Sequence, residues 1–186
     1  MLRCGRTYRK ERHRIPEDSL TIPAHMEIER KYLVSHMPEN IEQYEHTEIE
    51  QAYLCTSPTV RIRRYGDSYI LTVKERIRLD STAIHNREEE FSLSPESYGR
   101  LLSKCDSGRV SKTRYQIDLK QQTGQEQYAG LVAELDIFHG RHDGLVLVEV
   151  EFPNTETANN FTPPDWFGED VSSNPCYRNS FLASMP

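Results

Sequence analysis

The sequence predicts a mainly β (α+β) fold, a closed eight-stranded antiparallel β-barrel, or tunnel, with a charged lumen and a few covering helices. Eight segments alternate between polar and apolar residues at period 2, which is typical of strands. In seven of them the charged residues share one phase. The chain is only 36% hydrophobic, although ten Tyr and six Phe argue against disorder. A closed barrel with a polar interior accounts for all three observations, because about eight strands enclose a lumen that holds one small ligand.

The strands are expected in an unbroken series after the first 25 residues. Their ranges are 26–34, 46–54, 58–65, 68–77, 86–93, 110–119, 128–138 and 145–152. Turn-forming residues separate several of them, as at Gly66-Asp67. A helix is expected from Ser94 or Pro95 to Lys104, with Ser94 as its N-cap. Shorter helices are expected after Pro153 and Pro175.

The charged face of these strands carries both signs. It holds nine carboxylates (Glu27, Glu29, Glu88, Glu90, Asp118, Glu134, Asp136, Glu149, Glu151) and six cations (Lys31, Arg61, Arg63, Lys74, Lys112, Arg114). An antiparallel sheet with one wet outer face also alternates in this way, and for any single strand that interpretation is the simpler one. Charges repeated at i and i+2 over seven strands favour a lumen, with Asp118 expected at its mouth.

A lumen with this composition suits a particular ligand chemistry. Clustered carboxylates supply hard oxygen ligands for Mg²⁺ or Mn²⁺. Clustered Arg and Lys supply donors for phosphate oxygens. Both together predict an elongated polyanion bound with metal ions, as in phosphoryl transfer. The sequence contains no GxxxxGK[ST] phosphate-binding loop, so the common helix N-terminus route to nucleotides is excluded.

The ordered motifs resemble a known family. Glu27-x-Glu29-x-Lys31, within MEIERKYLV, resembles the ExExK signature that opens the CYTH superfamily, the triphosphate tunnel metalloenzymes. The segments TVRIRR, LTVK, REEEF, KTRYQIDL, AELDIF and LVLVEVEF follow in the order and phase of that family. The ending DWFGEDVSSNPCYRNSFLA is similar to its C-terminal segment, so that the resemblance covers about residues 26–183.

The resemblance implies hydrolysis of inorganic triphosphate to pyrophosphate and phosphate, dependent on Mg²⁺ or Mn²⁺. It implies metal ligands at Glu27, Glu29, Glu149 and Glu151, and a substrate clamp formed by Lys31, Arg61, Arg63, Lys74, Lys112 and Arg114. The catalytic group it implies comprises Glu29, Lys31, Glu88, Glu90 and Asp136. Glu134 either joins the acidic side of the tunnel or only neutralises a neighbouring Arg.

Other functions of the same fold stay open at this point. The alternatives are an enzyme acting on nucleoside or thiamine triphosphate, such as a class IV-type adenylate cyclase or a thiamine triphosphatase, and a non-catalytic polyphosphate-binding module. Near the C-terminus the family often has an acidic residue and an Arg, where this chain has Asn174 and Cys176. Arg178 is expected to supply the missing cation.

The expected domain organisation is a basic, disordered extension at residues 1–25 and a tunnel domain at residues 26–186. The extension has six basic and three acidic residues, so its charge of +3 leaves −9 for the rest of a chain whose net charge is −6. The four scattered cysteines are expected to be free thiols in a cytoplasmic protein. His139 and His142 flank an expected solvated turn rather than a metal site. We expect a small polyanionic substrate and neither nucleic-acid nor membrane partners, while the oligomeric state is left open.

Overall fold

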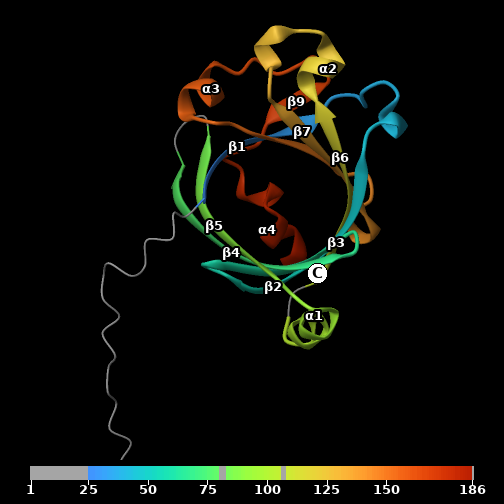
Figure 1. Cartoon of the computed structure of the whole chain (residues 1–186), viewed down its shortest axis with the longest axis vertical. Helices are drawn as coiled ribbons and strands as arrows, with labels where there is room; N and C mark the ends of the chain where they lie inside the picture. The colour runs from blue at the N-terminus through green and yellow to red at the C-terminus, as the bar shows by residue number, and fades with distance from the viewer. Residues whose placement is uncertain (1–24, 80–82, 106–107, 186) are drawn as a thin grey trace, which may run out of the picture.

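Eight strands close into a barrel in the computed structural model, which describes residues 25–79, 83–105 and 108–185 (Figure 1). The strands are β1 (His25–Val34), β2 (His46–Thr56), β3 (Thr59–Tyr65), β4 (Ser68–Leu79), β5 (Ile84–Ser92), β6 (Val110–Asp118), β7 (Val132–His139) and β8 (Val146–Glu151). Their order is β5-β4-β3-β2-β6-β7-β8-β1, and antiparallel pairing of β1 with β5 closes the ring. The predicted fold class is therefore confirmed.

A ninth strand, β9 (Phe167–Asp170), was not expected from the sequence. It pairs with the end of β1, where Val34 faces Phe167 and Tyr32 faces Asp170. Four residues are too few to show a period-2 pattern, which explains why the alternation did not reveal it.

Short helices connect and cover the strands. They are α1 (Pro95–Leu102), α2 (Leu119–Thr123), α3 (Thr155–Asn160) and α4 (Asn179–Ser184), with 3-10 turns η2 (Ile41–Gln43), η3 (Glu126–Tyr128), η4 (Gly140–His142) and η5 (Pro175–Tyr177). The expected cap of α1 is confirmed, because the Ser97 backbone N–H donates to Ser94 Oγ over 3.1 Å.

Local structure corrects three expectations. Asp118 is exposed and caps α2, where its Oδ1 accepts from the Gln121 N–H over 2.9 Å, and it does not line the cavity with most of the charged residues of its face. Strand β7 starts at Val132 rather than at Tyr128, because Tyr128 is buried in η3 and donates its hydroxyl to the Thr162 carbonyl. His142 is not solvated: its side chain is buried with its ring edge toward Phe138.

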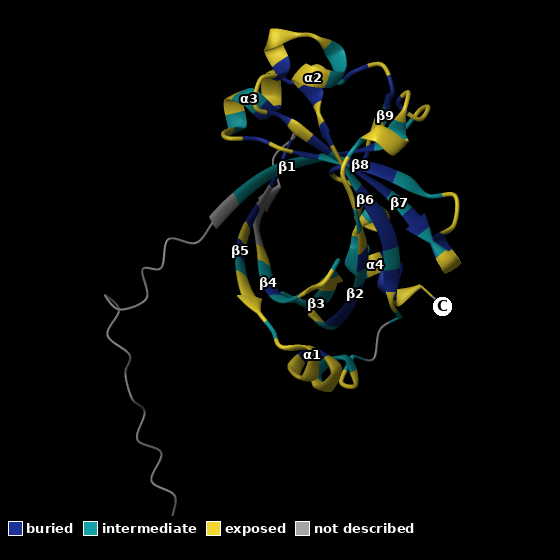
Figure 2. Cartoon of the chain, turned by 45° about the vertical axis from the view of Figure 1, so that its right-hand side comes forward, coloured by how far each residue is buried: buried dark blue, intermediate teal, exposed yellow. Residues whose placement is uncertain are grey.

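The apolar strand faces point outward over much of the barrel and are covered there. The largest core cluster joins Tyr32, Leu135 and Val148 to the segment that contains Phe161 and Trp166. Helix α1 covers the β3 side through contacts of Tyr98 with Ala52 and Ile62. Figure 2 shows α2, α3 and β9 gathered on one side of the ring of strands and α1 on the opposite side.

Helix α4 is the exception, because it lies on the inner side of the barrel wall. Leu182 and Ala183 pack against Val110, Phe138 and Leu147, which continue the charged lumen face of their strands. Figure 1 shows α4 within the ring of strands. One part of the lumen is therefore filled by apolar contacts, and the charged part remains as a cavity. None of the helices in the described residues has the length and hydropathy required to cross a bilayer.

Candidate functional site

The charged phase of the strands lines a cavity of about 1010 Å³. Twelve of the site residues expected from the sequence line it: Glu27, Glu29, Lys31, Arg61, Arg63, Lys74, Glu88, Glu90, Lys112, Arg114, Glu149 and Glu151. Glu134 also lines this cavity, whereas Asp136 does not. The charges therefore face the inside of the barrel, and the wet outer sheet that the alternation also allowed is excluded. The roles of the individual residues stay predictions.

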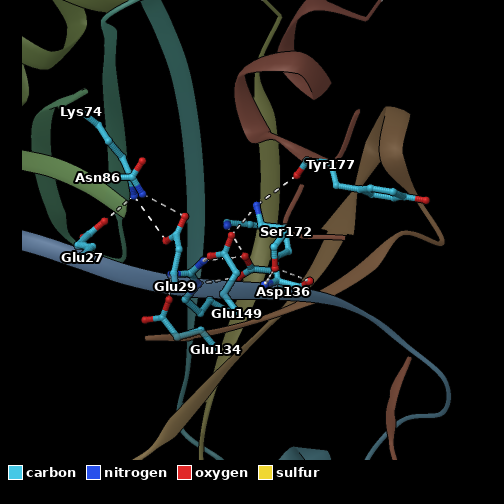
Figure 3. Close-up of polar contacts among 12 residues, drawn as sticks. Glu27, Glu29, Lys74, Asn86, Glu134, Asp136, Glu149, Ser172 and Tyr177 are labelled. Carbon is cyan, nitrogen blue, oxygen red and sulfur yellow. Dashed lines mark hydrogen bonds and ion pairs between the residues drawn. The ribbon is translucent and has the colours of Figure 1, made fainter. Parts of the chain in front are cut away.

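Strand β1 carries the ExExK triplet through the centre of this wall. It pairs with β8 so that Glu29 faces Glu151 and Lys31 faces Glu149. The Lys31 ammonium contacts Glu149 Oε1 over 2.6 Å and donates to the Tyr177 carbonyl over 3.2 Å (Figure 3). Direct cross-strand pairing places these side chains side by side, because opposite residues on antiparallel strands point to the same face.

On one side of β1 lies a group that we call the β4-side cluster. It consists of Glu27, Glu29, Arg61, Arg63, Lys74, Glu88 and Glu90. Lys74 Nζ lies 2.5 Å from Glu27 Oε2, 3.0 Å from Glu88 Oε2 and 3.6 Å from Glu29 Oε2. Three carboxylates thus share one ammonium group, and Figure 3 shows two of them, Glu27 and Glu29 on β1, beside Lys74.

In this crowded cluster the pKa values of Glu27 and Glu88 shift in opposite directions. Burial raises the pKa of Glu27, and the single cation Lys74 opposes the effect only in part. Burial also disfavours ionised Glu88, but Arg61 and Lys74 outweigh it and lower the pKa of Glu88. Arg61 Nη2 contacts Glu88 Oε1 over 3.1 Å, which supplies the second cation that Glu27 lacks. Glu88 is therefore ionised at neutral pH.

On the other side of β1 lies the β6-side cluster, formed by Lys31, Lys112, Arg114, Glu134, Asp136 and Glu149. Arg114 contacts Glu134, Asp136 and Glu149 from a single guanidinium group. Burial together with the neighbouring Arg114 lowers the pKa of Lys112 to about 8. Burial disfavours ionised Glu149 as well, but Lys31 and Arg114 hold the pKa of Glu149 well below its usual range.

Uncharged polar residues complete the wall, and the pattern of charged residues in the sequence does not reveal most of them. Asn86 Nδ2 donates to Glu29 Oε1 over 3.4 Å, and Thr72 Oγ1 donates to Glu90 Oε1 over 3.0 Å. Asn86 has the phase of Glu88 and Glu90, so the strand pattern could have identified it. Gln51 Nε2 donates to the Tyr53 hydroxyl over 2.8 Å, and both residues line the cavity.

The C-terminal segment contributes the remaining lining. Asn174 and Arg178, which stand near the departures from the expected pattern, both line the cavity. Asn174 Oδ1 accepts from the Cys176 backbone N–H over 3.0 Å and so begins η5. Cys176 itself is exposed and is not part of the lining.

The donor chemistry of this cavity fits a divalent metal ion. Glu27 and Glu29 on β1 and Glu151 on β8 are carboxylates on adjoining strands, and carboxylates are the ligands that Mg²⁺ and Mn²⁺ prefer. Within the described residues, no three Asp, Glu, His or Cys side chains already converge on one metal position. Glu27 is engaged by Lys74, so binding of a metal there requires an exchange of partners.

A comparison with protein families places the chain among known proteins. Residues 25–158 match the CYTH domain family. This range includes all eight barrel strands, from the ExExK triplet on β1 to the paired glutamates of β8.

Two curated relatives match as well, and the first of them matches over more residues than the family range. An inorganic triphosphatase of Nitrosomonas europaea is 35% identical over 165 residues, which cover 86% of this chain and 99% of the relative. An inorganic triphosphatase of Acetivibrio thermocellus is 33% identical over 129 residues, which cover 69% of this chain and 73% of the relative.

Solved structures share the architecture. A crystal structure of an inorganic triphosphatase is 33% identical and superposes with a TM-score of 0.61, covering 86% of this chain and 95% of that one. A protein of Pyrococcus horikoshii with 22% identity and a TM-score of 0.51 covers 72% of this chain and 83% of its own, and it shows the fold alone.

Proposed function

The chain belongs to the CYTH domain family, and we propose that it hydrolyses inorganic triphosphate to pyrophosphate and phosphate in the barrel lumen, with a divalent metal ion. The observation that carries this proposal is the cavity itself: six cations and seven carboxylates from the predicted charged face line one space. A linear polyanion accompanied by metal ions matches both sets of charges. The two curated relatives, both inorganic triphosphatases, support the same reaction.

The cations have the arrangement that a triphosphate clamp needs. Arg61 and Arg63 on β3 and Lys74 on β4 stand on one side, and Lys112 and Arg114 on β6 stand on the other. Each is paired with a carboxylate in this structure. These carboxylates neutralise and position the cations before substrate enters, and phosphate oxygens would then take over some of their contacts.

The carboxylates divide into two proposed roles. Glu27, Glu29, Glu149 and Glu151 are proposed to hold Mg²⁺ or Mn²⁺, which would polarise a phosphoryl oxygen and neutralise developing charge. Glu88 and Glu90 are proposed to orient the attacking water. Glu88 suits this role because its lowered pKa keeps it ionised, and an ionised carboxylate accepts hydrogen bonds from water.

Lys31 has a proposed double role at the boundary of the two clusters. Its ammonium group contacts Glu149 over 2.6 Å and lines the cavity. Lys31 can therefore bind a phosphate oxygen while it also holds the Glu149 carboxylate in place. A cation held there also stabilises negative charge that develops on the phosphoryl group.

The proposed cellular location and partner are consistent with this function. Cys55 and Cys176 are free thiols, which supports a cytoplasmic location. The proposed partner is the small polyanionic substrate alone.

The test is a substrate panel with purified protein and either Mg²⁺ or Mn²⁺. Tripolyphosphate, ATP, thiamine triphosphate and pyrophosphate are compared by phosphate release, and cyclic AMP is measured in the ATP reactions. We expect tripolyphosphate to be the fastest substrate and chelation of the metal to stop the reaction. Faster turnover of ATP or thiamine triphosphate would move the function to the nucleotide or thiamine branch of the fold. Tight binding without turnover would identify a polyphosphate-binding module.

A further inference from the structure

Asp136 is the one predicted site residue that the structure buries behind the cavity wall. The residue is 1% exposed, and it is absent from the cavity lining although its strand neighbour Glu134 is present there. It lies opposite Leu147 on β8, which belongs to the apolar cluster beneath α4. A substrate or metal ion in the cavity therefore does not reach the Asp136 carboxylate.

Asp136 instead forms ion pairs with the two β6 cations of the cavity wall, Lys112 and Arg114, and we call this arrangement the grip. Arg114 Nε donates to Asp136 Oδ1 over 2.7 Å, and Arg114 Nη2 donates to Asp136 Oδ2 over 2.7 Å. Lys112 Nζ contacts Asp136 Oδ2 as well. Arg114 is directly opposite Asp136 in the β6–β7 pairing, and Lys112 is two residues away on the same face. Both oxygens of one buried carboxylate are thus used to hold cations that line the cavity.

The geometry of the grip determines which partner a phosphate can replace. A carboxylate bound to the Nε and Nη2 edge of a guanidinium fixes both its plane and its position. The Arg114 Nη1 edge contacts Glu134, whose side chain is 35% exposed and lines the cavity. An incoming anion can displace Glu134, but displacement of Asp136 would leave a buried carboxylate without compensation, which is strongly unfavourable.

We propose that Asp136 is a positioning residue that holds the Lys112 and Arg114 cations toward the lumen for a triphosphate and itself touches neither substrate nor metal. The inference rests on the proposed function for the identity of the anion, whereas the grip on the two cations does not depend on it. It replaces the catalytic role that the sequence suggested for Asp136. The carboxylates that can act on substrate are then those that line the cavity.

The two roles predict opposite kinetic effects of Asp136→Asn. A positioning residue acts through binding cations, so the KM for tripolyphosphate should rise by about tenfold or more while kcat changes by less than about threefold. A residue that holds a metal or orients water would lower kcat with little change in KM. That second result, or a KM equal to that of the wild-type protein, would overturn the proposal.

Asp118→Asn is the matched control on the same pair of strands. Asp118 is an exposed carboxylate at the end of β6 that caps α2, and Asn is an equally good cap. Its KM and kcat should both stay at the wild-type values. The control separates loss of a carboxylate in general from loss of the grip on Lys112 and Arg114.

A measurement without substrate covers the case in which Asp136→Asn folds poorly. Denaturant unfolding is compared for Asp136→Asn, Lys112→Met and the double variant. The double variant should be more stable than the sum of the two single losses predicts, because it leaves no unpaired ammonium in the wall. Additive losses would contradict the grip. If the variants show this coupling but the wild-type protein does not hydrolyse triphosphate, the ion pairs of Asp136 are supported and the proposed function is wrong.

Discussion

The two charged clusters of the lumen differ in how much freedom their ion pairs have. In the β6-side cluster, three cations and three carboxylates balance, and Lys112 and Asp136 are each 2% exposed at the side chain. The β4-side cluster has four carboxylates for three cations, and Glu90 is 41% exposed at the side chain. A balanced, buried network resists change, whereas an open and carboxylate-rich one can accept a further cation.

This difference assigns separate tasks to the two walls. The β6 side keeps Lys112 and Arg114 in place, and the β4 side has the carboxylate excess that a divalent metal would neutralise. Strand β1 joins the two, because Glu27 and Glu29 face the β4 side while Lys31 contacts Glu149 on β8. The lumen therefore combines a half in which buried Asp136 holds Lys112 and Arg114 rigidly with a half in which an excess of carboxylates can exchange partners.

The strongest test of the open half removes a carboxylate of β1. Glu29→Gln should lower kcat by more than about a hundredfold, because a neutral amide binds a divalent metal poorly and charge stabilisation is the main source of catalysis. The fold should persist, since Glu29 is one of three carboxylates around Lys74. Phosphate release from tripolyphosphate and Mn²⁺ titration provide the two measurements.

Glu169→Gln is the control for that variant, because Glu169 is an exposed carboxylate on β9 outside the cavity lining. Its activity should match the wild type. Full activity in Glu29→Gln would remove the metal role proposed for this residue and would weaken the contrast between the two walls.

A second test compares the stability of the two networks directly. Arg114→Met leaves Asp136 buried with only Lys112 and should cost about 3–5 kcal/mol of the free energy of unfolding. Arg63→Met breaks the pair with exposed Glu90 and should cost about 1 kcal/mol or less. Urea unfolding curves measure both values. Equal costs would show that the two clusters do not differ in rigidity.

The third test uses pH to switch one cation of the rigid wall. Burial and Arg114 lower the pKa of Lys112 to about 8, so its ammonium is charged below that pH and is lost above it. The KM for tripolyphosphate should therefore rise above about pH 8, by up to about tenfold per pH unit. KM measured at pH values from about 6.5 to 9.5 provides the profile.

Lys112→Met is the control in this series. Without an ammonium group to titrate, its KM should be high throughout and should not show the rise above about pH 8. A wild-type KM that stays constant across the whole range would mean that Lys112 is not a binding cation in the neutral to alkaline range.

The smallest effect is expected from the N-terminal extension. All residues of both clusters follow residue 26, so removal of residues 1–24 should leave kcat/KM for tripolyphosphate unchanged. Steady-state kinetics of the shortened protein provide the measurement. A large loss would show that the basic extension takes part in function.

The fold was predictable because the charges face inward. A lumen that binds a polyanion forces charge onto one phase of every wall strand, and Glu27, Glu29 and Lys31 already show that phase. Elements of four or five residues, such as β9 and α2, are too short to produce a period. Their positions depend on caps and contacts with distant segments, which periodicity does not report.

The sequence predicted which strand face each site residue occupies, but not how deeply each one is buried. The strand phase placed Asp136 with Glu134 on the inner face, and both do point inward. It did not reveal that α4 fills the lumen beside Leu147, the cross-strand partner of Asp136. It also drew attention away from Asn86 and Thr72, which share the phase but carry no charge.

The central claim is that a triphosphate binds between the two walls with its metal ion on the carboxylate-rich side. A crystal structure with tripolyphosphate and Mn²⁺, prepared with a slow variant such as Glu29→Asp, tests it most directly. We predict phosphate density in contact with Lys112 and Arg114, and an anomalous manganese signal between position 29 on β1 and Glu151 on β8. Phosphate bound outside the lumen, or manganese bound at Asp136, would contradict the account.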